Sequence, residues 1–266
     1  MMTIKQYVRA ESLEQAYQLN QVRANRVLGG MLWLNTSKLA VNTAIDLSGL
    51  GLDQIEEGED AFSIGAMVTL RQLELHPGLN AYTQGAMAKS VQDIVGVQFR
   101  NMATVGGSLF GRFGFSDVLT MFLALDAQVE LYHAGTLSIR EFAQRTPDRD
   151  LLVRVVVRKR PGRFVYQSVR NTRTDLPTLT CAVSQVDGAY RLAVGARPMK
   201  AVLLTDEEGL LAQGITPESA RAFGEYAART VPTSGNLRGS QAYRTHLVQV
   251  LTQRGILELG GDHHGA

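Results

Sequence analysis

The sequence is poor in cysteine and in long apolar runs. Its one cysteine, Cys181, cannot form an internal disulfide, and one thiol cannot ligate an iron–sulfur cluster or a thiolate zinc site. The uncharged stretch from Val118 to Leu125 spans eight residues, whereas a helix that crosses a membrane needs about 20. The N-terminal residues MMTIKQY lack the apolar core of a secretory signal. We therefore expect no membrane span and a cytoplasmic location.

Neither sign of charge dominates. The 27 basic and 25 acidic residues are interspersed, and no stripe of Lys and Arg alternates with aromatic residues. This pattern argues against a nucleic-acid partner. With 45% apolar and 20% charged residues, the chain has the composition of a globular protein. Its 266 residues allow one large domain or two modest ones.

Apolar spacing and turn residues predict strands followed by helices in both halves of the chain. Strands are expected at residues 26–28, 44–47, 62–66, 128–132, 151–157, 164–169, 178–186 and 190–194. Helices are expected at residues 11–22, 69–77, 79–95, 118–125, 217–229 and 240–257. The glycine-rich segment 96–114 is expected to be a long loop, and Asp187-Gly188 a hairpin turn. Regular βαβ alternation is missing, so the predicted fold class is α+β.

A polar break at residues 158–162 predicts a domain boundary. We expect a first domain at residues 1–160, with subdomains at about 1–53 and 54–160. A second domain follows at residues 161–260, and the tail 261–266 is expected to be frayed.

Two glycine signals stand out, Gly29-Gly30 after a strand and Gly106-Gly107 within the segment 103–108. Neither belongs to a Rossmann or P-loop motif. Consecutive glycines let backbone amides approach a phosphate, so two such loops could hold one pyrophosphate. Tight turns without a ligand are the alternative. The histidines show no spacing typical of metal ligands, and no metal site is predicted.

The phrase VQFRNMATVGGSL at residues 97–109, followed by Ser116-Asp117 and then LALDA at residues 123–127, resembles the FAD-binding subunit of molybdenum hydroxylases. That family includes the flavin subunits of xanthine dehydrogenase and carbon monoxide dehydrogenase. The likeness covers nearly the full chain, because residues 64–70 and 238–247 also match sequence motifs of the family. It implies a two-part FAD-binding domain of the p-cresol methylhydroxylase / vanillyl-alcohol oxidase type and a smaller α+β C-terminal domain.

The resemblance implies FAD contacts from a first loop, a second loop and three single positions. These are Leu28, Gly29, Gly30, Met31, Leu32 and Trp33; Thr104, Gly106, Gly107 and Ser108; and Ile94, Asp117 and Gln167. Asp117 would hydrogen-bond a polar edge of FAD, or alternatively cap a helix. Gln167 stands where some relatives place a lysine near the isoalloxazine.

The chain departs from the family in the first loop, where Met31-Leu32 replaces a usual Thr-Asp pair. Losing such a polar side chain costs about 1 to 3 kcal/mol. The backbone amides survive the change, so FAD binding is expected to persist. The alternative is that Met31, Leu32 and Trp33 are core side chains with no ligand role.

The resemblance also implies a function and partners. FAD in this chain would receive electrons from [2Fe-2S] clusters in an iron–sulfur subunit, after hydroxylation at the molybdenum cofactor of a molybdopterin-binding subunit. It would pass them to NAD or another acceptor. No catalytic residue is predicted here, because the flavin carries the redox chemistry. Two alternatives stay open, a flavin-free structural subunit of such a complex and a free-standing flavin oxidoreductase.

Overall fold

The first sheet of the computed structural model, which describes residues 2–261, has the order β1-β3-β2 with parallel pairing. Its strands are β1 (Thr3–Arg9), β2 (Arg26–Leu28) and β3 (Ala40–Asp46). Helix α1 (Leu13–Asn20) packs against β3, and Ser12 caps it as its position predicts. The sequence does not predict β1, because most of its residues are exposed and no apolar alternation marks it.

The second sheet has the order β4-β5-β8-β6-β7 with antiparallel pairing. Its strands are β4 (Ile55–Glu57), β5 (Ala61–Gly65), β6 (Gln128–Leu131), β7 (Gly135–Ser138) and β8 (Leu152–Arg158). The helices of this region are α3 (Leu70–Leu75), α4 (Pro77–Tyr82), α5 (Ala86–Val91), α6 (Val97–Met102), α7 (Val105–Phe110), α8 (Asp117–Ala124) and α9 (Ile139–Gln144).

The glycine-rich segment 96–114 is not the long loop that we expect from its composition, because it contains α6 and α7. The Thr104 hydroxyl caps α7, and the apolar side chains of Val105 and Leu109 are buried. Six-residue helices are too short to show a clear apolar period. The expected helix 79–95 is also interrupted, since Gly85 adopts a left-handed φ of 82° before α5.

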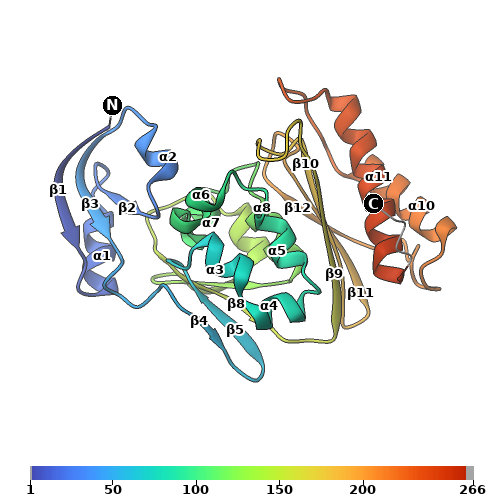
Figure 1. Ribbon diagram of the computed structural model, residues 1–266, viewed down its shortest axis with the longest axis horizontal. Helices are drawn as coiled ribbons and strands as arrows, with labels where there is room; N and C mark the ends of the chain where they lie inside the picture. Colours follow the sequence, from blue (N-terminus) through green and yellow to red (C-terminus); the bar gives the residue numbers. More distant parts are fainter. Residues whose placement is uncertain (1, 262–266) are drawn as a thin grey trace.

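The third sheet has the antiparallel order β12-β11-β10-β9. Its strands are β9 (Gly162–Val169), β10 (Leu179–Val186), β11 (Ala189–Gly195) and β12 (Val202–Thr205). The Asp187-Gly188 hairpin is confirmed, with φ of 51° and 79°. Helix α11 (Gln241–Gly260) packs on β9 and β10, and α10 (Pro217–Thr230) packs against α11. These helices lie on the outer side of the sheet in Figure 1, whereas α5 and α8 contact the other side.

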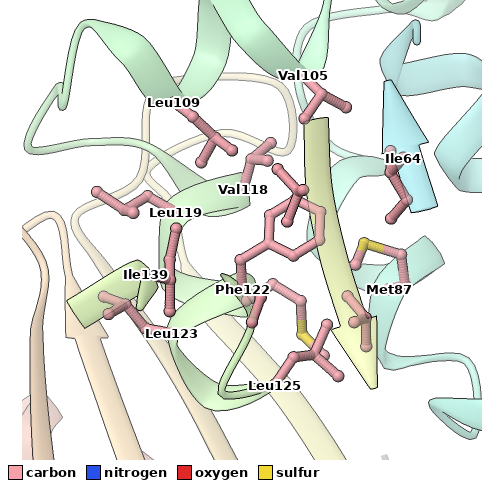
Figure 2. Packing of buried hydrophobic residues seen from close by; sticks show 14 of the residues in the cluster. Ile64, Met87, Val105, Leu109, Val118, Leu119, Phe122, Leu123, Leu125 and Ile139 are labelled. Carbon is pink, nitrogen blue, oxygen red and sulfur yellow. The ribbon is translucent and has the colours of Figure 1, made fainter. Parts of the chain in front are cut away.

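Helix α8 is the centre of the largest core. All eight of its residues are buried, as its apolar sequence predicts. Figure 2 shows Phe122 of α8 surrounded by Met87, Val105 and Ile64 from other elements. Ser116 is the N-cap of α8, since its hydroxyl accepts from the Leu119 amide. The alternative role of Asp117 as that cap is therefore wrong.

The fold class is α+β, as predicted. In chain order, the last strand of the second sheet is β8, which ends at Arg158, and the first strand of the third sheet is β9, which begins at Gly162. The domain bounds at 160 and 161 and the subdomain bound near 53 stay predictions. Residues 262–266 of the expected frayed tail lie outside the described residues. Within residues 2–261, no helix combines the length and apolar composition that a membrane span requires.

Candidate cofactor site

The first glycine loop connects β2 to the short helix α2 (Leu32–Asn35). Gly30 has a φ of 85° and Met31 a φ of 63°, so the chain turns sharply through the left-handed region at two consecutive residues. Among the described residues, none accepts a hydrogen bond from the backbone amides of residues 29–34. The loop therefore presents a run of amides that can bind an anion.

The second glycine segment, residues 103–108, behaves differently, because Gly106 and Gly107 lie in the first turn of helix α7. The Val105 amide donates to Val68 O at 2.8 Å, and the Gly106 amide donates to Ala66 O at 2.7 Å. The Gly107 amide donates to Thr104 Oγ1 at 3.1 Å. These amides are satisfied within the protein, so the expectation that they also cradle phosphate is not supported. This loop instead anchors the first one.

The two loops touch through their glycines. A Cβ on Gly30 would lie 2.0 Å from Met102 O, and a Cβ on Gly107 would lie 2.7 Å from Gly29 O. A Cβ on Gly29 would lie 3.1 Å from Thr104 Oγ1. Only glycine allows this close backbone approach. The structure thus brings the two predicted loops together.

A cavity of about 570 Å³ opens beside the loops. It is within the range typical of cofactor sites. Predicted site residues that line it are Gly29, Met31, Leu32, Trp33, Ile94, Thr104, Gly107, Ser108 and Asp117. Trp33 packs against Phe115 at a centroid distance of 5.6 Å, and Phe113 stacks on Phe115 at 5.3 Å. One wall of the cavity is therefore aromatic.

Met31, Leu32 and Trp33 are not fully buried core side chains, because α2 has no buried residue and Trp33 is 48% exposed. Leu32 packs against the edge of the core and lines the cavity at the same time. The alternative that these side chains are merely core is wrong for Trp33. For the other two, the position on the cavity wall is compatible with a ligand contact.

The lining of the cavity also includes charged residues. It contains Arg170, Asp175 and Arg238 from the C-terminal half of the chain, together with Asp117. The Asp117 carboxylate accepts from Tyr166 Oη at 2.5 Å and from Arg170 Nη2 at 2.5 Å. Burial raises the pKa of Asp117 to about 6, although the Arg170 charge and the Tyr166 hydroxyl oppose that rise.

Gln167 does not reach this cavity. It pairs with Cys181 of β10, and its side-chain amide donates to Glu258 Oε2 of α11 at 3.0 Å. Successive residues of a strand point to opposite faces, so Tyr166 faces α8 while Gln167 faces α11. The expected contact of Gln167 with the cofactor is therefore not supported.

A second cavity of about 310 Å³ lies on the other side of the loop pair. Leu28 and Gly106 line this cavity and not the larger one. Val27, Gly29, Thr104 and Gly107 line both cavities. A long ligand can thus cross the loop pair and occupy both.

Sequence reasoning misses several residues of the larger cavity. These are Phe99, Phe113, Phe115, Arg170, Asp175 and Arg238. The segment 170–177 follows a strand and is rich in turn-forming and charged residues, which was the available signal. Nothing local indicates that it faces α8.

A parallel-stranded N-terminal subdomain, a glycine loop with free amides and a divided cavity together define a dinucleotide-binding protein. Residues 2–159 match the family "FAD binding domain in molybdopterin dehydrogenase", and residues 164–259 match "CO dehydrogenase flavoprotein C-terminal domain". The chain belongs to the FAD-binding medium subunits of the molybdenum hydroxylase family. It is therefore a flavoprotein subunit of an oxidoreductase.

Similar proteins span nearly the same length. The chain is 29% identical over 238 residues to the nicotine 6-hydroxylase medium subunit of Paenarthrobacter nicotinovorans, covering 82% of both chains. It is 27% identical over 253 residues to the uncharacterized protein YgfM of Escherichia coli K12, covering 93% of both. The structure of carbon monoxide dehydrogenase from Hydrogenophaga pseudoflava shares the fold, with a TM-score of 0.85, 22% identity and 96% coverage of both chains.

Proposed function

We propose that this chain binds FAD across the two cavities and transfers electrons within a complex. The observation that carries the proposal is the meeting of the two glycine loops, which places the free amides of residues 29–34 beside the larger cavity. Amides in such a run hold phosphate without a basic side chain. FAD supplies the redox chemistry when bound, and the protein binds and orients it.

The residues present fit a dinucleotide. A Cβ at Gly30 would fill the space that the first loop keeps open against Met102. Ser108 lines the larger cavity, and its hydroxyl has no hydrogen-bond partner among the described residues. The aromatic wall of Trp33, Phe113 and Phe115 suits a flat ring system. These features favour Trp33, Ile94, Ser108 and Asp117 as cofactor contacts.

The partners follow from what the chain itself cannot hold. Its single cysteine cannot ligate an iron–sulfur cluster. We therefore propose an iron–sulfur subunit that delivers electrons and a molybdopterin-binding subunit that hydroxylates the substrate. NAD is the proposed acceptor, with another acceptor as the alternative. The cytoplasmic location stays a prediction from the N-terminal sequence.

Titration with FAD tests the binding proposal. Trp33 is the single tryptophan and lines the larger cavity, so FAD should quench its fluorescence saturably. Trp33→Phe is the control for the origin of the signal, and flavin absorbance after gel filtration is an independent measure. No uptake by the folded protein would favour the flavin-free structural subunit, for which the Met31-Leu32 pair is the motivation.

Capture of the native complex tests the partner proposal. The chain should co-purify with chains that contain iron, acid-labile sulfide and molybdenum. NAD reduction by that complex identifies the acceptor, and parallel assays with quinones and artificial dyes cover the alternatives. A chain that purifies alone, contains FAD and turns over a substrate would instead be a free-standing flavin oxidoreductase.

A further inference from the structure

A buried ion pair joins the two halves of the chain at the wall of the larger cavity. Arg170 Nη2 lies 2.5 Å from Asp117 Oδ1, and the two side chains are only 6% and 5% exposed. Asp117 is the first residue of α8, and Arg170 directly follows β9. Both residues line the cavity.

Stability does not explain this pair well. The cost of removing two charges from water offsets most of their mutual attraction. A protein with apolar residues of similar size in place of a buried ion pair is often equally stable. The charges also lie on a cavity wall, where no packing demand requires an ion pair. A role toward the ligand accounts for the position.

The geometry leaves one carboxylate oxygen available. Tyr166 Oη and Arg170 Nη2 both donate to Asp117 Oδ1. Among the described residues, no side chain donates to Asp117 Oδ2, and the backbone amide of Asp117 itself also bonds the carboxyl. Tyr166 lies in β9 and Arg170 directly follows that strand, and both side chains reach the same carboxylate oxygen. Two donors on one oxygen fix the plane of the carboxylate.

Because Oδ1 already accepts from two donors, a proton taken up by the carboxyl would go to Oδ2, which would then donate a hydrogen bond instead of accepting one. The oxidised isoalloxazine ring carries a single N–H that such an acceptor can bind. We propose that Arg170 is a positioning residue of the FAD site, which keeps Asp117 ionised and oriented so that Oδ2 accepts from the flavin ring. The inference rests on the proposed FAD binding and adds a role for a residue of the C-terminal half.

Several other groups act on this carboxylate. On the β9 side, Tyr166 donates to it, and Cys181 of β10 lies close to Tyr166. The loops after β9 and before α11 add a carboxylate and a guanidinium to the cavity wall. The groups that face Asp117 or line its cavity are Tyr166, Arg170, Asp175 and Arg238.

The test is the pH dependence of FAD affinity, measured by fluorescence titration of the apoprotein from pH 5 to pH 9. In the wild type, affinity should fall below about pH 6, where Asp117 takes up a proton. In Arg170→Met, loss of the cation raises the pKa of Asp117, so the fall begins at higher pH. At pH 6.5 this variant should bind FAD at least about tenfold more weakly, and it should recover to within about threefold by pH 9.

Three variants control the experiment. Asp117→Asn should bind with no dependence on pH in this window. Arg173→Met removes an 82% exposed arginine of the same loop, which pairs with Asp93, and it should leave the curve unchanged. Tyr166→Phe removes one hydroxyl donor and should move the curve in the same direction by less. If circular dichroism shows that Arg170→Met does not fold, the pH dependence of FAD affinity is measured with Tyr166→Phe in its place.

The outcomes separate the two proposals. No FAD binding by the wild type overturns the proposed function. FAD binding by the wild type, with Arg170→Met weakened equally at every pH or not at all, leaves that function intact and overturns the positioning role of Arg170.

Discussion

At Gly30 the backbone holds a φ of 85° with Met102 O directly against the position of a Cβ. Gly30→Ala should therefore separate the two loops, lower the free energy of unfolding by several kcal/mol and abolish FAD uptake. Gly51→Ala is the matched control, since Gly51 has a φ of 67° but no atom within 4 Å of a Cβ. The control should lose only about 1 kcal/mol from backbone strain. Urea unfolding and FAD titration measure both variants, and equal losses would contradict the steric explanation.

The Asp117 carboxyl gives the apoprotein a specific pH dependence. Burial raises its pKa to about 6 in the folded state, so the folded protein binds this proton more tightly than the unfolded chain does. The free energy of unfolding should then fall as pH rises from about 4 to 6, by on the order of 3 kcal/mol for this group.

Asp117→Asn removes that titration. Urea unfolding at several pH values should show a difference between wild type and variant that changes over this window and is level above it. A difference independent of pH would mean that Asp117 stays ionised throughout.

At the scale of elements, the N-cap of α7 fixes the glycine pair Gly106-Gly107, which lies in the first turn of that helix. Thr104 is 4% exposed, and its hydroxyl accepts from the Gly107 amide at 3.1 Å. Thr104→Val keeps the shape but loses the cap, so it should lower the free energy of unfolding by about 1 kcal/mol and weaken FAD binding. Thr104→Ser keeps the hydroxyl and should retain most of both. Equal behaviour of the two variants in urea unfolding and FAD titration would rule out the cap as the cause.

Some elements are predictable from local sequence and others are not. The Asp187-Gly188 turn is confirmed, and like the helix caps Ser12 and Ser116 it depends on contacts within a few residues. Strand β1 and helices α6 and α7 are missed. Strand β1 is largely exposed and pairs with β3, about forty positions away, so its own residues show no pattern. The two helices have six residues each, which is less than two turns and too short for an apolar period to be recognised.

At the scale of the whole molecule, the two cavities meet at Val27, Gly29, Thr104 and Gly107. A ligand that fills both should bind more tightly than one that fills the larger cavity alone. FMN lacks the adenosine monophosphate half of FAD, so we expect its affinity to be about hundredfold lower, which corresponds to about 3 kcal/mol. Competition titrations with FAD, FMN and riboflavin measure this order. Equal affinities for FAD and FMN would confine the ligand to the larger cavity.

Several properties follow from the order of residues alone. They include the α+β class, the glycine loop at residues 29–30 and the buried helix α8. The resemblance of residues 97–109 to a flavoprotein phrase also needs no coordinates. Turns, caps and apolar runs reflect neighbouring residues, and neighbours are visible in a sequence.

The charged wall of the cavity has a different origin. Asp117 and Arg170 are 53 positions apart, and they meet only because α8 packs on β10 and β11 of the third sheet, whose edge strand β9 leads into Arg170. The same packing turns Tyr166 toward Asp117 and Gln167 toward Glu258. The tertiary structure also decides that the amides of residues 29–34 stay free, whereas those of Val105 and Gly106 bond to other parts of the protein. These contacts depend on which face of each strand is buried. An isolated strand could bury either face, and only packing against distant elements selects one.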